Sequence, residues 1–283
     1  MNAAAPTRDE MTAWSRHIHE ICGIYLDDTK AYLVETRLGP LLRETGAGGW
    51  AELLYKVKTD AGNTLRTKVV SAITTNETSF FRDTSPFELL QHKLFPELID
   101  RRNKAGVRPV PIRILSAACS TGQEVYSTAI VLKELLGDFK GYDVRILGLD
   151  ISDAAVAQAS YAHFTRLELD RGMTPDKLAR YFEPSGDRWK VRDELRALAT
   201  FRRANLLEPI ANATPFDIIF CRNVAIYFTE SDKIRLFKNL GRHLQKDGAL
   251  IIGSTESIAG LCPEFTPMRY LRAVYYQRNS VAS

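Results

Sequence analysis

Apolar residues recur at helical spacing through the first third of the chain. Trp14, Ile18, Ile21 and Cys22 lie at positions i, i+4, i+7 and i+8, which places them on one face of a helix. The same kind of spacing predicts further helices around residues 32–42, 50–57 and 65–73. The pattern predicts no strand before residue 110.

Local signals mark the ends of these helices. Gly39 and Pro40 interrupt the second helix and predict a kink or a split. Asn63 and Thr64 predict the cap that opens the fourth helix, and Pro86 predicts the start of a fifth.

Short apolar runs replace the helical spacing after the polar stretch 101–111. The runs that predict strands cover residues 112–118, 144–150, 200–204, 216–221, 249–253 and 273–276. Long amphipathic stretches separate most of them, and this alternation is typical of a mostly parallel sheet covered by helices on both faces. The stretch 184–199 breaks the rhythm and is either a small β hairpin inserted into the fold or a long loop.

We therefore predict an α/β protein with a small all-helical N-terminal domain over residues 1–95 and a linker over 96–111. Residues 112–283 are predicted to form a doubly wound, Rossmann-like domain with a mostly parallel sheet and a possible small β insertion near 184–199. The length of 283 residues allows two domains that each bury a core.

Composition and charge exclude several classes of protein. The chain is 45% hydrophobic and 25% charged, which excludes disordered and fibrous classes. The net charge is +4, and the dense basic cluster at residues 101–108 looks like linker, so we expect no nucleic-acid binding. No apolar run approaches the ~18 residues of a membrane helix, and the first twenty residues lack an apolar signal core, so we expect a cytoplasmic protein without membrane insertion.

Cysteine usage predicts neither a metal site nor a disulfide framework. The four cysteines are widely scattered and form no CxxC pair. We expect buried free thiols and no metal.

The first candidate for chemistry is the stretch from Ala117 to Glu124, where the first strand turns into the first helix of the sheet domain. A helix N-terminus and a tight backbone meet a ligand at this position. Gly122 is the single glycine there, so a ligand without phosphates, such as S-adenosylmethionine, fits better than a pyrophosphate. The alternative is an ordinary strand–helix turn.

Polar residues follow three further strands at the same predicted edge. Asp150 ends the second strand, where a carboxylate can accept hydrogen bonds from two ribose hydroxyls, and its alternative role is to cap the next helix. Asn205 follows the third strand and Asn223 the fourth, and an asparagine amide can pair with an adenine edge or an amino-acid moiety. Each asparagine alone is more often a turn residue, and the combination carries the prediction.

The second candidate is the segment Thr74–Arg82, TTNETSFFR, at the end of the fourth helix. Polar residues followed by two aromatic residues and an arginine suggest a loop that covers a ligand. The alternative is a capping sequence with two phenylalanines in the core.

Five motifs then occur in a fixed order: TTNETSFFRD, AACSTGQEVYS, LGLD, NLL and CRNVAIYF. Over nearly its whole length the chain resembles the chemotaxis receptor methyltransferases, which transfer methyl groups from S-adenosylmethionine to receptor glutamates. The resemblance implies S-adenosyl-L-methionine as methyl donor, S-adenosyl-L-homocysteine as product, no metal, and a methyltransferase domain over residues 112–283.

The motifs also imply roles for individual residues. Those expected to bind the cofactor are Asn76, Thr78, Arg82, Ala118, Glu124, Asp150, Asn205, Leu206, Asn223 and Val224. Arg82 and Tyr227 are expected to orient the substrate carboxylate, although Tyr227 could instead be a core residue. The receptor's acidic cytoplasmic helices would be attracted to a basic face on the second helix, with Lys30, Arg37 and Arg43 as candidates, or this face is simply solvated.

Two departures from the family pattern bear on these expectations. The first motif usually reads STGEEPYS, and Gln123 and Val125 replace two of its residues, so the start of that helix is expected to differ. The family's β excursion can carry a loop that docks a receptor's C-terminal peptide. The corresponding stretch, Pro184 to Val191, looks short, so we do not expect such tethering.

Two other functions remain open from the sequence. The acceptor could be another carboxylate or a nucleic-acid base, although Arg222-Asn223-Val224 differs from the Asn/Asp-Pro-Pro-aromatic turn of adenine methyltransferases. The chain could also be a non-catalytic signalling adaptor that binds the cofactor, a reading against which Arg82 and Tyr227 argue.

Overall fold

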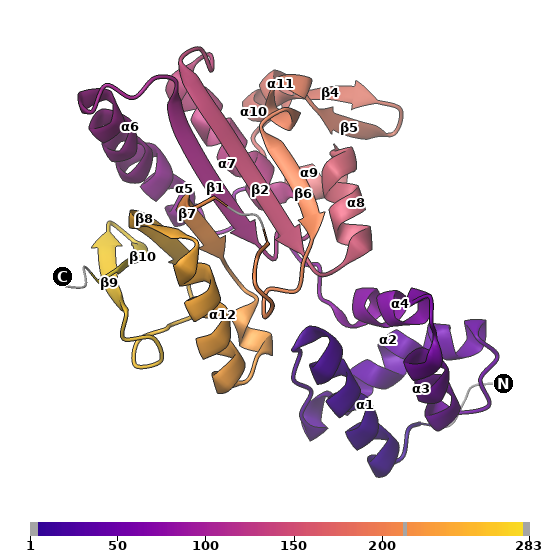
Figure 1. The fold of residues 1–283 in the computed structure, drawn as a ribbon. Helices are drawn as coiled ribbons and strands as arrows, with labels where there is room; N and C mark the ends of the chain where they lie inside the picture. Colours follow the sequence, from indigo (N-terminus) through magenta and orange to yellow (C-terminus); the bar gives the residue numbers. More distant parts are fainter. Residues whose placement is uncertain (1–4, 212–213, 280–283) are drawn as a thin grey trace.

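The computed structural model describes residues 5–211 and 214–279, so the outermost ends of the two predicted domain ranges, residues 1–4 and 280–283, lie outside the description. A helical bundle stands beside the lower edge of a twisted sheet in the view of Figure 1. The predicted combination of an all-helical N-terminal part with a mostly parallel sheet is confirmed.

The N-terminal bundle contains the four helices that the apolar spacing predicted. They are α1 (Arg8–Cys22), α2 (Ala31–Glu44), α3 (Trp50–Thr59) and α4 (Thr64–Ile73), with a short 3₁₀ turn η1 (Asp28–Lys30) before α2. Their buried faces share one hydrophobic core, to which Trp14, Ile18, Leu38, Leu53 and Val69 each contribute a side chain without exposed surface. The core explains why these short helices form, because packing of an apolar face stabilises a helix more than local propensity does.

Two local predictions in this bundle need correction. Of the predicted kink or split in α2, the split is wrong, because the helix runs through Pro40 and Leu41 and Leu42 remain buried in the bundle core. Helix α4 begins at Thr64 as predicted, but Asn63 makes no side-chain cap and has φ of 55°. The carboxylate of Asp60 instead accepts the backbone N–H of Leu65 at 2.6 Å.

The fifth predicted helix belongs to the sheet rather than to the bundle. It consists of α5 (Ser85–Leu89), a π-helical turn η2 (Leu90–Leu94) and α6 (Phe95–Lys104), so the predicted linker is helical as far as residue 104. Its buried side chains share a core with strand residues such as Ile112 and Ile114. Packing therefore joins residues 85–104 to the sheet.

The main sheet has seven strands in the order β6-β2-β1-β7-β8-β10-β9. These strands are β1 (Val110–Ala117), β2 (Tyr142–Asp150), β6 (Ala199–Arg203), β7 (Phe216–Cys221), β8 (Leu244–Ile252), β9 (Phe265–Tyr270) and β10 (Ala273–Arg278). The first five in the spatial order pair in parallel, and β10 pairs antiparallel with both β8 and β9. The polar ends of β1, β2, β6 and β7 therefore share one edge.

Alternate residues of the central strands face two separate cores. Ile218 and Phe220 of β7 pack with α5, α6 and α7 (Gln123–Leu136), whereas Ile219 and Cys221 pack with α12 (Glu230–Arg242). Figure 1 shows α7 and α12 on opposite faces of the sheet. This arrangement explains why the strands read as continuous apolar runs.

The sequence analysis missed β9. This strand lies at the outer edge of the sheet and contains Pro267, which cannot donate a backbone hydrogen bond. Proline is tolerated at an edge strand, but it weakens the sequence signal for a strand.

A second, smaller sheet interrupts the main fold, and it confirms the hairpin alternative for the stretch near 184–199. Strands β4 (Phe182–Ser185) and β5 (Arg188–Val191) form the hairpin, and β3 (His163–Phe164) pairs with β5. Short helices surround it: α9 (Arg166–Asp170), α10 (Pro175–Tyr181) and α11 (Asp193–Arg196). Helix α8 (Asp153–Tyr161) leads into this region from β2.

Two further expectations concern single features of the chain. All four cysteines are buried free thiols, as predicted. Within the described residues, no helix combines the length and apolar character of a membrane span.

We predict that Asp217→Ala destabilises the protein by ~3 kcal/mol. Asp217 is buried and accepts hydrogen bonds from both terminal nitrogens of Arg102 and from the backbone of Arg113, so its loss leaves a mostly buried guanidinium without its partner. Urea denaturation measures the change.

The matched control is Arg101→Ala, which removes the arginine next to Arg102 on α6. Arg101 pairs with Asp247 at 2.7 Å, but both side chains are about half exposed, so the expected cost is below ~1 kcal/mol. Equal losses in the two variants would contradict the assignment of Asp217 to the structural core.

Candidate active site

A single cavity brings the predicted site residues together. It lies at the carboxyl ends of β1, β2, β6 and β7, under the segment 74–82 that leads away from the helical bundle. Its atom-free space, which includes the open solvent at its mouth, is about 990 Å³. The predicted residues that line it are Asn76, Thr78, Arg82, Ala118, Glu124, Asp150, Asn205, Leu206, Asn223, Val224 and Tyr227.

The loop between β1 and α7 adopts an unusual backbone. Ala118 and Ser120 have φ of 60° and 50°, and Gly122 has φ of 96° at the start of α7. A Cβ on Gly122 would lie 3.0 Å from the Cβ of Ala159, so glycine is required both for its backbone angle and for this close approach. No side chain caps α7, and the Gln123 side chain instead accepts a hydrogen bond from Thr121.

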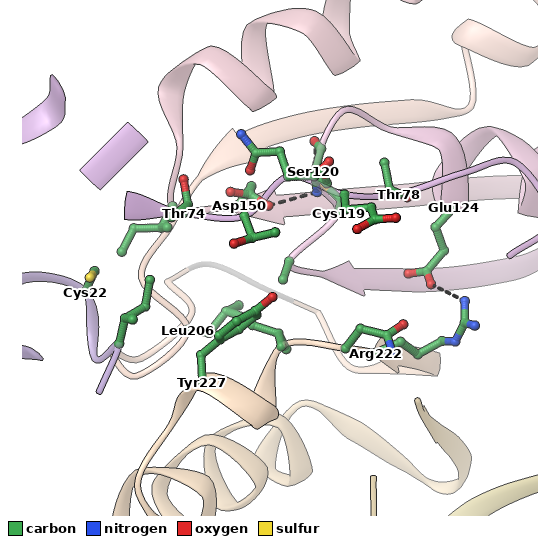
Figure 2. A pocket seen from close by; sticks show the side chains of 18 of the residues that line it. Cys22, Thr74, Thr78, Cys119, Ser120, Glu124, Asp150, Leu206, Arg222 and Tyr227 are labelled. Carbon is green, nitrogen blue, oxygen red and sulfur yellow. Dashed lines mark hydrogen bonds and ion pairs between the residues drawn. The ribbon is translucent and has the colours of Figure 1, made fainter. Parts of the chain in front are cut away.

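Asp150 ties two of the cavity loops to each other. One carboxylate oxygen accepts the N–H of Ser120 at 2.8 Å (Figure 2). The other oxygen accepts the N–H of Ser152 at 2.9 Å. Burial raises the pKa of Asp150 above its usual value, while these backbone donors act in the opposite direction. Ser152 caps α8 through the N–H of Ala155, so Asp150 is more than a helix cap.

A buried arginine that the sequence analysis did not select also lines the cavity. Arg222 follows β7 and donates to Glu124, to Asp83 and to the backbone oxygen of Arg82, each at 2.9 Å. Figure 2 shows its ion pair with Glu124 at one end of the cavity. A charged residue directly after the apolar run IIFC at the end of β7 was the signal that could have revealed it.

Both oxygens of the Glu124 carboxylate already have partners in the protein. One accepts from Arg222, and the other accepts from the Ser116 hydroxyl at 2.8 Å. A carboxylate offers about four acceptor positions, so Glu124 retains capacity for a cationic group in the cavity.

The segment 74–82 combines features of both sequence readings, although Phe81 is only partly buried. Phe80 is buried among Phe164 and Phe182, as the core alternative requires. The polar residues before it line the cavity, and the backbone oxygen of Asn76 accepts from the Ser120 hydroxyl at 3.0 Å. The segment is therefore anchored in the core while it covers the cavity.

Arg37, one of the three candidates for receptor contact, is engaged within the protein. Its guanidinium donates to the backbone oxygens of Ile73 and Thr74 and to the Thr75 hydroxyl, so it holds the end of α4 and the start of the covering segment. Of the other two receptor-contact candidates, Lys30 pairs with Asp27 at 3.5 Å and Arg43 is exposed.

Arg82 and Tyr227 both line the cavity, Arg82 from the covering segment and Tyr227 from the turn that follows β7. Arg82 is half-buried and donates to the backbone oxygen of Glu77 at 2.9 Å. Tyr227 belongs to the 3₁₀ turn η3 (Ala225–Tyr227), and in Figure 2 its ring points into the space below Asp150 and Ser120. The backbone oxygen of Tyr227 also accepts the N–H of Tyr25 from the helical bundle at 2.9 Å.

Two further residues missed by the sequence analysis support the asparagine loops. Asn239 of α12 is buried and donates to the backbone oxygens of Leu206 and Glu208 at 3.1 and 2.6 Å. Glu256 accepts the N–H of Asn223 at 2.7 Å, where the asparagine has φ of 57°. Neither residue lies in a recognisable motif, because each acts through a fold contact.

Comparison with known proteins identifies the family to which this site belongs. Residues 76–273 match the SAM-binding domain of CheR methyltransferases, and residues 9–74 match the all-alpha domain of the same family. The chain belongs to the CheR methyltransferase family. It is therefore an S-adenosylmethionine-dependent methyltransferase of chemotaxis.

Individual relatives match this CheR-family protein over almost its full length. Chemotaxis protein methyltransferase Cher2 of Pseudomonas putida is 37% identical over 265 residues, which are 92% of this chain and 94% of the relative. Chemotaxis protein methyltransferase 1 of Vibrio cholerae is 37% identical over 280 residues, which are 98% of this chain and 99% of the relative. Among the described residues of this CheR-family protein, no three His, Cys, Asp or Glu side chains gather as a metal site would require.

We predict that binding of S-adenosylhomocysteine weakens as pH falls through the raised pKa of Asp150. Ribose hydroxyls that donate to the ionised carboxylate would lower this pKa in the complex, so protonation of the free protein opposes binding. Calorimetric titrations from neutral to mildly acidic pH measure the effect.

The control is Asp150→Asn, which has no carboxylate to titrate. Its free energy of binding S-adenosylhomocysteine at neutral pH should be less favourable by ~1–3 kcal/mol. Its binding should also lack the part of the pH dependence that Asp150 causes. Parallel pH profiles for the two proteins would exclude Asp150 from ligand binding.

Proposed function

We propose that this CheR-family protein methylates glutamate side-chain carboxylates on the cytoplasmic domains of chemotaxis receptors and so tunes receptor signalling in adaptation. The observation that carries the proposal is the placement of Arg82 and Tyr227 on the wall of one cavity with Asp150, Asn205 and Asn223. An arginine and a tyrosine at the lining of a methyl-donor site are suited to hold an anionic acceptor.

The proposed cofactor contacts follow the chemistry of the lining residues. Asp150 would accept the ribose hydroxyls, and Glu124 would face the methionine ammonium while Arg222 holds it in place. Asn205 and Leu206 would flank adenine, with Asn223 and Val224 near the methionine end. Asn76, Thr78 and Ala118 would close the cavity around the ligand.

The acceptor chemistry fits a site without a general base. A glutamate carboxylate has an ordinary pKa near ~4.3 and is ionised at neutral pH, so no proton has to be removed. When bound, S-adenosylmethionine would supply an electrophilic methyl group: an O–CH₃ bond would form while the S–CH₃ bond breaks, and the electron pair of the broken bond would stay on sulfur. The protein contributes placement, and good orientation can supply as much as ~7–11 kcal/mol of a barrier.

Arg82 and Tyr227 would provide that placement. Arg82 can hold the carboxylate by charge-assisted hydrogen bonds, and the Tyr227 hydroxyl can orient one oxygen toward the methyl group. Because the acceptor loses its negative charge during transfer, very tight binding by Arg82 would stabilise the ground state more than the transition state. Orientation is therefore the main role that we assign to Arg82.

The partner would be an acidic helical surface on a cytoplasmic receptor domain. Lys30 and Arg43 are the basic side chains of the predicted face that are not bound to the covering segment. The connection between β4 and β5 consists of Gly186 and Asp187 alone, which supports the expectation that no receptor peptide is tethered there. We also retain the proposals of a cytoplasmic location, no metal and no nucleic-acid partner.

Methylation of a different carboxylate acceptor is the main alternative, and an adaptor without catalysis is the other. To distinguish these functions, the protein is incubated with methyl-labelled S-adenosylmethionine and receptor cytoplasmic fragments, and the labelled fragments are then treated with mild base. Base-labile label on receptor glutamates supports the proposal. Base-stable label, or no label, would refute it.

Arg82→Ala is expected to reduce methyl transfer by at least ~100-fold, because the acceptor carboxylate loses its cationic partner. Binding of S-adenosylhomocysteine should remain measurable, since the four strand-end loops are unchanged. Turnover assays and calorimetry on the same preparation test this split.

Arg145→Ala provides the control for loss of one positive charge. Its side chain is 75% exposed and lies outside the residues that line the cavity, so turnover should match that of the unmodified protein. Normal turnover in Arg82→Ala would remove this residue from the mechanism.

A further inference from the structure

The segment 74–82 has a close neighbour that belongs to the region of the small sheet. Gly172, which follows α9, has φ of 121°. A Cβ built on it would overlap the backbone oxygen of Phe80, well inside the 3.0 Å limit that real Cβ contacts observe. Position 172 therefore requires glycine both for its backbone angle and for this contact.

The residue that Gly172 contacts cannot easily move aside. The Phe80 ring packs edge-to-face against Phe164 and Phe182, with ring centroids 4.9 and 5.5 Å apart. The next residue, Phe81, donates its backbone N–H to the Ser127 hydroxyl at 3.0 Å and has φ of 50°. Any displacement of the Phe80 backbone is therefore passed along the segment rather than absorbed locally.

A second contact from the same region reaches the segment at Glu77. Arg171 forms an ion pair with the Glu77 carboxylate at 3.0 Å. The backbone oxygen of Glu77 in turn accepts from the guanidinium of Arg82. Arg171 thus contacts the segment at Glu77, and Gly172 contacts it at Phe80. Glu77 binds the Arg82 side chain, and Phe80 precedes Arg82 by two residues.

We propose that Gly172 and Arg171 are positioning residues for methyl transfer, which set the location of Arg82 through Phe80 and Glu77. This inference rests on the proposed function, because Arg82 matters only if it orients the acceptor. According to this inference, the region of the small sheet helps to orient Arg82, although Arg171 and Gly172 do not line the cavity. A displacement of the order of 1 Å at a reacting group can cost ~100-fold in rate.

Gly172→Ala tests the proposal, with Gly186→Ala as the matched control. Gly186 also has positive φ, at the turn between β4 and β5, but a Cβ there would meet no atom within 4 Å. Both variants carry the backbone strain of a non-glycine residue in this region, and Gly172→Ala adds the clash with Phe80. Assays run well below the melting temperature of each variant.

We expect Gly172→Ala to lower kcat by ~100-fold and to weaken binding of S-adenosylhomocysteine by a smaller factor, because the strand-end loops stay in place. Gly186→Ala should stay within about twofold of the unmodified protein in both measurements, since the strain there is remote from the segment. A kcat in Gly172→Ala equal to that of Gly186→Ala would overturn the proposal.

A charge exchange provides a second test if Gly172→Ala does not fold. Arg171 and Glu77 are more than half exposed, so changes there should leave folding intact. Arg171→Glu should lower kcat by about threefold through repulsion of Glu77, and the double variant Arg171→Glu/Glu77→Arg should recover it. An unchanged kcat in Arg171→Glu, or no recovery in the double variant, would count against the proposal.

The two proposals fail in distinguishable ways. If the unmodified protein does not methylate receptor fragments, the proposed function is wrong. The position of the covering segment is then still tested by ligand binding, since Asn76 and Thr78 line the cavity. Weaker S-adenosylhomocysteine binding in Gly172→Ala than in Gly186→Ala supports the positioning contact, and equal binding would refute it.

Discussion

The buried guanidinium of Arg222 is the interaction on which the rest of the site depends. It joins the end of β7 to Glu124 at the start of α7 and to Asp83 and the Arg82 backbone at the end of the covering segment. Taking such a charge out of water costs several kcal/mol, and two carboxylates and a backbone oxygen offset this cost. An apolar residue would avoid the cost, but it would not fix the three elements relative to one another.

The backbone around the cavity also adopts locally unfavourable conformations in order to place its polar groups. Positive φ occurs at Phe81, Asp83, Ala118, Ser120 and Asn223, none of which is glycine. Such conformations cost of the order of 1–3 kcal/mol each when the surroundings do not compensate for them. Hydrogen bonds and core packing hold them here, and the result is a set of loops whose polar groups converge on one space.

The two hydrophobic cores make this convergence possible. The sheet is packed on both faces, so its carboxyl edge is a rigid platform, and α5 and α6 belong to that platform rather than to the helical bundle. The bundle then meets the platform through the segment 74–82 and through the backbone contact from Tyr25 to Tyr227. The cavity therefore lies where the helical bundle meets the sheet. The bundle has its own hydrophobic core, and the sheet has one core on each face.

The sequence by itself determined the local elements and the residues at the strand ends. Helical spacing around Trp14 and apolar runs before Asp150 and Asn223 indicate burial directly. Whether a side chain is buried depends on its own position in the helix or strand, so the residue type at that position records it. The family motifs add the residues of the cavity, and the structure brings all of them to one place.

Only the tertiary structure decided the contacts between elements. The sequence does not show that Arg37 holds the covering segment, that Arg222 pairs with Glu124 across the site, or that Gly172 meets Phe80. In each case the partners lie far apart along the chain, and their distance depends on how the sheet, the bundle and the small sheet pack. Periodicity and motifs describe the environment of one residue, whereas these interactions depend on the relative position of two.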